Sequence, residues 1–117
     1  VLYSFATQIF GVGTSKYNAF SEEYSKVLEY EIVMKWRELE GIVEDISITS
    51  QINTSNSVIK FLAENHFIDN NEFNILREFL KMRNNIVYAT DIKYTTEELK
   101  RMLGEINHII NKLEEII

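Results

Sequence analysis

Apolar residues recur at alternating spacings of three and four along most of this chain, and that spacing predicts α-helices. The 117 residues include no proline, the residue that most strongly interrupts a helix. Strand-like alternation is poor throughout. The clearest helical stripe is the last one, formed by Leu99, Leu103, Ile106, Ile110, Leu113 and Ile117. The sequence therefore predicts an all-α protein.

Four helices are predicted, near residues 21–47, 57–66, 70–88 and 96–117. The last two begin with capping boxes, Asp69 with Glu72 and Thr95 with Glu98, in which each side chain bonds the other residue's free amide. The connections are short, so we expect a four-helix antiparallel bundle. Gly41 lies inside the first helix, where it marks either a close helix crossing or a bend.

The first residues differ from the rest. Val1 to Phe10 is apolar, and Gly11 and Gly13 separate it from the first helical pattern. This stretch is too short to span a membrane, which takes about 20 apolar residues, and it lacks the basic start of a signal peptide. We expect an N-terminal arm, or the stub of a longer chain, over residues 1–16, and one cytoplasmic helical domain over residues 17–117.

Composition narrows the chemistry. The chain has no cysteine and only two histidines, His66 and His108, so we expect no disulfide, metal site or cofactor. The net charge of −6 argues against general polyanion binding. The charge is uneven, however: residues 22–50 carry a net charge of −5, and residues 77–101 carry +2. The basic segment therefore favours an anionic ligand there.

One arginine lies in the apolar stripe of the third predicted helix. A guanidinium keeps its charge at ordinary pH and is rarely buried without a partner. Arg83 therefore either pairs with a carboxylate or carbonyl inside the fold or lines a binding site. Lys81 and Lys93 are the ligand-binding candidates beside it. The predicted stripe consists of Phe73, Leu76, Leu80, Arg83 and Val87.

The stretch Arg83-Asn84-Asn85-Ile86-Val87-Tyr88 resembles the end of the third helix of HEPN domains. This helical family contains prokaryotic toxin and antiviral ribonucleases and non-catalytic relatives. The resemblance covers residues 22–117. In active relatives an arginine and a histidine act together on an RNA phosphate, usually across a two-fold dimer. The resemblance therefore implies a homodimer, and a site at Arg83, Asn84 and Tyr88, with Tyr88 where active relatives have histidine.

This departure from the family pattern bears directly on catalysis. Histidine, with an ordinary pKa of about 6.5, exchanges protons near neutral pH, whereas a tyrosine stays protonated and is a poor base. We expect a non-catalytic module of a toxin or defence system that binds RNA, a nucleotide or a protein. Two alternatives stay open: an active ribonuclease that uses Arg83 and Asn84 with Tyr88 or His66 as the proton carrier, and an assembly domain in which Arg83 is structural.

Two further expectations concern geometry. The last two helices each carry a second apolar row, and a bundle of this size needs about one row per helix, so the surplus predicts a subunit contact. Side chains five residues apart point about 140° apart on a regular helix. We therefore expect the third helix to end near Val87, with Arg83 half-buried and facing a groove lined by Asn84 and Tyr88. The second rows are Ile75, Phe79, Met82 and Ile86, and Met102, Ile109 and Ile116.

Overall fold

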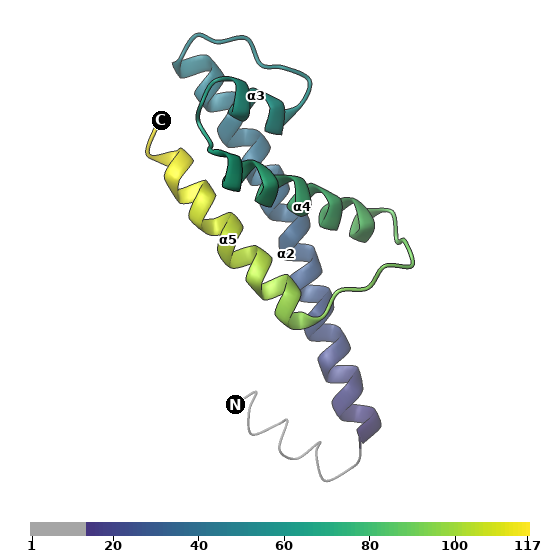
Figure 1. Ribbon diagram of the computed structural model, residues 1–117. Helices are drawn as coiled ribbons and strands as arrows, with labels where there is room; N and C mark the ends of the chain where they lie inside the picture. Colours follow the sequence, from purple (N-terminus) through teal and green to yellow (C-terminus); the bar gives the residue numbers. More distant parts are fainter. Residues whose placement is uncertain (1–13) are drawn as a thin grey trace.

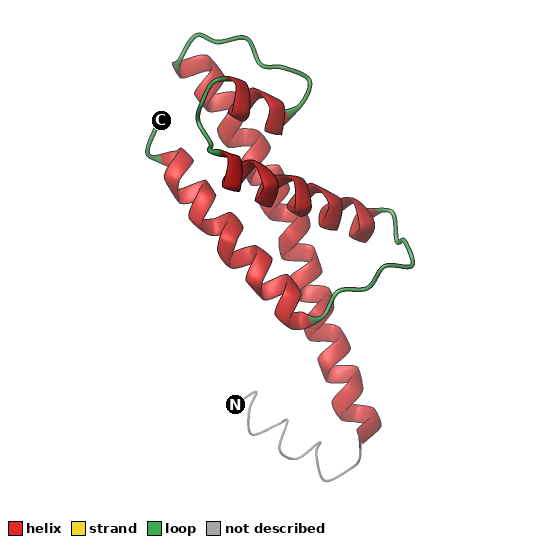
Figure 2. Cartoon of the chain, viewed as in Figure 1, coloured by secondary structure: helices red, strands yellow, loops and turns green. Residues whose placement is uncertain are grey.

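The computed structural model describes the backbone of residues 14–117 and the side chains of residues 22–117. In that range the chain forms four α-helices and no strand (Figure 2). They are α2 (Thr14–Thr49), α3 (Val58–Glu64), α4 (Asn70–Val87) and α5 (Thr96–Glu114). The all-α prediction is confirmed. The first helix begins earlier than predicted, at Thr14, and residues 1–13 of the predicted arm lie outside the described residues.

The long helix α2 forms the spine of the bundle (Figure 1). The short helix α3 packs near the end of α2, α4 crosses α2, and α5 lies along it. Helix α4 runs back against α5, whereas α2 and α5 run in the same direction. The mostly antiparallel packing predicted for the bundle holds for α4 and α5 but not for α2 and α5.

The core draws on all four helices. Ile32 and Leu39 of α2, Leu62 of α3, Leu76 of α4 and Ile106 of α5 are fully buried in it. The space beside Gly41 is open, because a methyl group on its Cα would have no described atom of another helix within 4 Å. The close-crossing interpretation of Gly41 is therefore wrong.

The second apolar rows of α4 and α5 are also part of this core. Phe79, Met82, Met102 and Ile109 are all buried within the monomer. Their assignment to a subunit contact is therefore wrong, because each of these helices packs against two neighbours and buries a face wider than one row. Only Ile116 of the named residues is exposed. The homodimer itself remains a prediction without this support.

Three helices end in the same motif, and none uses glycine. The residues just past α2, α3 and α4 are Gln51, His66 and Ala89, with φ angles of 56°, 62° and 50°. After α3, the His66 amide donates to the Ala63 carbonyl (3.2 Å) and the Phe67 amide donates to the Leu62 carbonyl (2.9 Å). The other two ends repeat this pairing. These are Schellman caps, which satisfy carbonyl groups that the helix leaves free.

We expect Ala89→Gly to raise the free energy of unfolding by about 0.5–1 kcal/mol. The left-handed backbone at Ala89 strains an L-residue but not glycine, and the greater freedom of glycine in the unfolded chain offsets part of the gain. Urea denaturation measures this change. The control Ala63→Gly, inside α3, should instead lower the free energy of unfolding by about 1 kcal/mol. A loss of stability in Ala89→Gly would contradict the left-handed backbone of the Schellman cap at Ala89.

A buried carboxylate joins the start of α4 to the end of α5. Both predicted capping boxes are present, and in the first the Glu72 Oε1 atom accepts the Asp69 amide at 2.9 Å. The same oxygen accepts a hydrogen bond from Lys112 Nζ at 2.7 Å. The Glu72 side chain is 10% exposed and that of Lys112 is 45% exposed. Of the ion pairs between described residues, this one alone joins two helices.

Lys112→Met should lower the free energy of unfolding by about 0.5–1 kcal/mol, because it leaves a nearly buried carboxylate without its cation while solvent screens the exposed lysine. Glu72→Ala should lower the free energy of unfolding by more, about 1–2 kcal/mol, because the helix cap is lost as well. Urea denaturation measures both changes. The matched control is Lys35→Met, which breaks a surface pair within α2. An equal loss of unfolding free energy in Lys112→Met and Lys35→Met would show that the Glu72–Lys112 pair stabilises the fold no more than a surface pair does.

Candidate functional site

Arg83 lies near the C-terminal end of α4 and is half-buried, as predicted. Its Nη1 atom donates to Asn84 Oδ1 at 2.9 Å. Its Nε atom is buried and has no hydrogen-bond partner among the described residues. No described carboxylate lies within ion-pair distance of Arg83. The interpretation of Arg83 as one half of an internal ion pair therefore finds no support in this part of the chain.

The predicted apolar stripe of α4 is the edge of its buried face. Leu76 is fully buried, but Phe73 and Leu80 are only partly buried and Val87 is 44% exposed. The centre of the buried face runs through Leu76, Phe79 and Met82. The predicted stripe passes through Leu80 and Arg83, whereas the buried face passes through the residues just before them, Phe79 and Met82. The difference arises because α5 covers a side of α4 that the spacing alone does not reveal.

Tyr88 caps α4 with its backbone, while its side chain faces solvent. Its amide donates to the Asn84 carbonyl at 2.9 Å, and the helix ends at Val87 as predicted. The side chain is 71% exposed and is not among the residues that line the groove beside Asn84. The prediction that Asn84 and Tyr88 share a groove is therefore wrong for Tyr88. No hydrogen bond joins the described side chains of Tyr88 and Arg83, because α4 stays regular to Val87 and side chains five positions apart point about 140° apart.

A groove runs between α3 and α4 and is called the α3–α4 groove below. It consists of two adjoining hollows of about 470 and 300 Å³, which share Ile59, Arg77 and Leu80. The larger hollow lies beside α3 and includes Lys60 and Phe73. The smaller one is lined by Lys81, Asn84 and Asn85 toward the end of α4. The floor of the α3–α4 groove is apolar, and its walls carry cations and amides.

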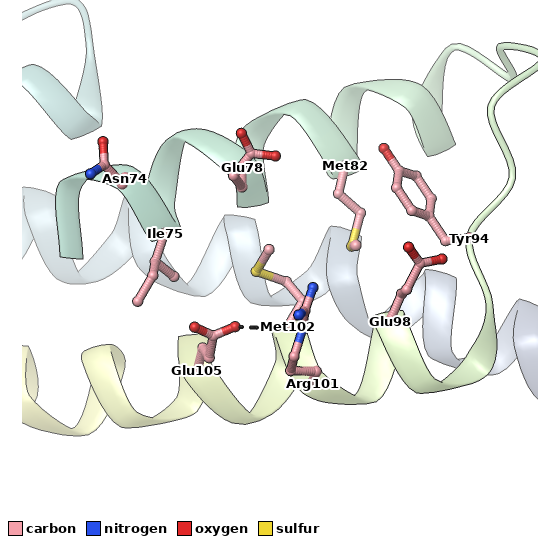
Figure 3. Close-up of a pocket in the computed structure, with 9 residues that line it drawn as sticks. All are labelled: Asn74, Ile75, Glu78, Met82, Tyr94, Glu98, Arg101, Met102 and Glu105. Atoms are coloured by element: carbon pink, nitrogen blue, oxygen red, sulfur yellow. Dashed lines mark ion pairs between the residues drawn. The ribbon is translucent and has the colours of Figure 1, made fainter. Parts of the chain in front are cut away.

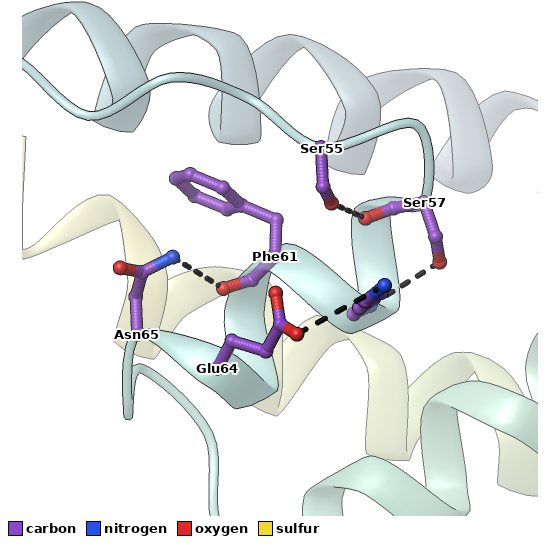
Figure 4. A network of polar contacts seen from close by, with 6 residues as sticks. Ser55, Ser57, Phe61, Glu64 and Asn65 are labelled. Carbon is purple, nitrogen blue, oxygen red and sulfur yellow. Dashed lines mark hydrogen bonds and ion pairs between the residues drawn. The ribbon is translucent and has the colours of Figure 1, made fainter.

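Local hydrogen bonds hold the α3 wall of this groove (Figure 4). Ser57 Oγ caps the helix by accepting the Lys60 amide at 3.2 Å, and Ser55 Oγ donates to the Ser57 carbonyl at 2.7 Å. At the other end, Asn65 Nδ2 donates to the Phe61 carbonyl at 2.9 Å. Phe61 points away from this rim into the core, where it is fully buried. These bonds fix the position of Lys60 on the groove's edge.

The charges of the α3–α4 groove are mostly positive. Lys60, Arg77 and Lys81 stand against Glu64, a local net charge of +2 in a chain whose net charge is −6. Lys60 and Glu64 are 4.0 Å apart and well exposed, so solvent screens their attraction. The Arg77 guanidinium lies 5.8 Å from the centre of the Phe73 ring. These cations therefore remain available to an anion.

Arg83 reaches the groove only through Asn84. Because Asn84 Oδ1 accepts the Arg83 bond, the amide group of Asn84 keeps its two N–H donors for other partners. Asn85 has a different part: its Nδ2 atom donates to the Tyr94 hydroxyl at 2.7 Å, and its Oδ1 atom accepts from Thr90 at 3.1 Å. Asn85 thus ties the α4–α5 connection to α4. Arg83, by contrast, positions the Asn84 side chain.

The structure brings two of the predicted site residues together in the groove, Lys81 and Asn84. Lys93 is exposed in the α4–α5 connection and does not line the groove. Sequence reasoning missed Lys60 and Arg77 as site residues. A signal for Arg77 was present, because Arg77, Lys81 and Asn84 follow one another at spacings of four and three, which places them on one face of a helix. Lys60 joins them only through the packing of α3.

The α3–α4 groove offers cations, amides and apolar surface, and the residues lining its two hollows include no histidine. His66 forms part of the α3 cap and His108 is exposed on α5. Among residues 22–117, no cluster of three or more histidine and acidic side chains could hold a metal ion.

No described helix is long and apolar enough to cross a membrane. Comparisons with protein-family models, with curated proteins and with solved structures gave no match to this chain.

Proposed function

We propose that this chain is a non-catalytic, HEPN-like helical module of the toxin or defence type that binds RNA along the α3–α4 groove. The observation that carries the proposal is the row Arg77, Lys81 and Asn84 on α4, with Lys60 facing it from α3. A cationic row beside an apolar floor suits a polyanion that also carries flat bases. An otherwise acidic surface restricts binding of that polyanion to this groove.

Each residue of the groove has a distinct role in this proposal. Arg77, Lys81 and Lys60 neutralise phosphates, which provides most of the affinity and makes it depend on salt. The free amide donors of Asn84 bond to a base edge or a ribose hydroxyl, because single-stranded RNA exposes both. Tyr88, exposed one turn beyond Asn84, offers an aromatic face on which a base stacks.

Cleavage is not part of the proposal. General acid–base catalysis contributes about 10²- to 10⁴-fold to a reaction rate and needs a group that exchanges protons near neutral pH. Tyrosine stands at position 88 where active HEPN relatives have histidine, and no described hydrogen bond holds Tyr88 against Arg83. We also propose that the chain forms a homodimer, and this rests on the HEPN resemblance alone.

RNA binding should follow the groove's charges. We expect a fluorescein-labelled 12-nucleotide oligouridine to bind, as measured by fluorescence anisotropy across a series of salt concentrations. The double variant Arg77→Ala/Lys81→Ala should weaken binding by tenfold or more and reduce the slope of log affinity against log salt by about 1–2, because two phosphate contacts are lost. Asn84→Ala should weaken binding without changing that slope, because it removes no charge.

The matched control for the double variant is Lys93→Ala/Lys100→Ala, which removes the same charge outside the groove. It should bind within about twofold of the unmodified protein. Equal weakening by both double variants would show that only overall charge matters. Failure of the unmodified protein to bind the oligonucleotide at low salt would contradict RNA binding altogether.

We expect the unmodified protein to leave RNA intact, because tyrosine stands at position 88 where active HEPN relatives have histidine. The measurement is gel electrophoresis of end-labelled RNA after prolonged incubation at pH 7. The control is Arg83→Ala from a parallel preparation, which reveals contaminating nucleases. Cleavage by the unmodified protein that disappears in Arg83→Ala would overturn the non-catalytic proposal in favour of the ribonuclease alternative. Tyr88→His is the single change that we most expect to create RNA cleavage, because it places the family's histidine at this position.

A further inference from the structure

A second groove lies on the other flank of α4, between α4 and α5, and is called the α4–α5 groove below (Figure 3). The two helices are joined at one end by the Glu72–Lys112 bond and diverge toward the connection that links them (Figure 1). The divergence leaves a hollow of about 340 Å³. Tyr94, held by its bond from Asn85, closes the wide end.

The floor of this groove is apolar and adaptable. Met82 of α4 and Met102 of α5 point into the space between the helices, with Ile75 beside them (Figure 3). Methionine side chains are unbranched and polarisable, so they adjust to apolar groups of different shapes. Met82 and Met102 are each only 5% exposed, so a partner's hydrophobic side chain would contact their ends together with the partly buried Ile75.

The rim of the groove is acidic on both sides. Glu78 stands on α4, and Glu98 and Glu105 stand on α5, with Arg101 as the one cation among the lining residues. Arg101 and Glu105 are 4.0 Å apart on the exposed surface, so their pairing is weak. One oxygen of Glu98 accepts the Thr95 amide in the helix cap. The rim therefore keeps a net charge of −2 around an apolar floor.

The groove is elongated rather than compact. A neighbouring hollow of about 530 Å³ continues it along the same two helices and shares Ile75, Arg101 and Glu105 with the first. It extends over Ile109 toward Glu72. The charged residues that line it carry a net charge of −1: Asp69, Glu72 and Glu105 against Lys100 and Arg101. A small cation would fill one hollow, whereas a helix laid along the groove places successive apolar residues in both.

We propose that the α4–α5 groove binds a basic amphipathic helix of a partner protein. The apolar face of that helix lies on Met82 and Met102, and its flanking lysine or arginine residues lie over Glu78, Glu98 and Glu105. A second copy of this chain fits poorly: its exposed apolar face on α2, which includes Val27 and Tyr30, is flanked by Glu23 and Glu31. Like charges would then oppose each other across the contact.

The three methionines of the chain report where such a helix binds. Met82 and Met102 line the groove, whereas Met34 is exposed on α2, away from it. We expect an 18-residue synthetic peptide, with leucines on one helical face and lysines on both flanks, to shift the NMR signals of the Met82 and Met102 methyl groups in ¹³C-methyl-methionine protein. The Met34 signal, assigned with Met34→Leu, should stay in place.

Charge reversal tests the rim. Glu78→Lys/Glu105→Lys should weaken peptide binding by tenfold or more, and it should create binding of a peptide in which glutamates replace the lysines. Glu40→Lys/Glu44→Lys changes the net charge equally at exposed positions of α2 and should bind like the unmodified protein. The proposal is overturned if both double variants weaken binding equally, if the peptide shifts Met34 alone, or if millimolar peptide shifts none of the three signals.

Discussion

Burial of the apolar face of α2 is the interaction on which the rest of the structure depends. Its 36 residues span about 54 Å at 1.5 Å per residue, and its buried hydrophobic residues run from Leu28 to Ile46. Helices α3, α4 and α5 are all shorter, and each packs against this face. Tyr24, Val27 and Tyr30 are exposed on its N-terminal half, although Leu28 and Ile32 at the same level of the helix are buried.

The position of α4 on this spine creates both grooves. Helix α4 crosses α2 with α3 on one flank and α5 on the other, so each flank borders a hollow. The residues facing α3 include Arg77 and Lys81, and those facing α5 include Glu78. One helix thereby separates a cationic surface from an anionic one. An anionic strand and a cationic helix could bind to the two flanks at the same time without competing.

Arg83 shows how a correct observation led to an incomplete interpretation. Its half-buried position follows from the spacing of apolar residues along α4, and the structure confirms it. Whether it pairs internally or lines a site depended on which residues approach it from other helices. The bond to Asn84, next to it in sequence, positions the Asn84 side chain at the groove.

The sequence by itself determined the features that arise within a few residues. The helical periods, both capping boxes and the end of α4 depend on spacings of three and four and on bonds from one residue to its near neighbours. The Schellman caps are equally local, but Gln51, His66 and Ala89 carry no glycine signal, so the sequence did not reveal them.

Only the tertiary structure decided the rest. It placed Phe79 and Met82 in the core, brought Lys60 beside Arg77, and joined Glu72 to Lys112 across 40 residues. The physical reason is that a periodic pattern shows which residues share a face of one helix. Which neighbour covers that face depends on the angles at which separate helices cross, and those angles follow from packing the whole core at once.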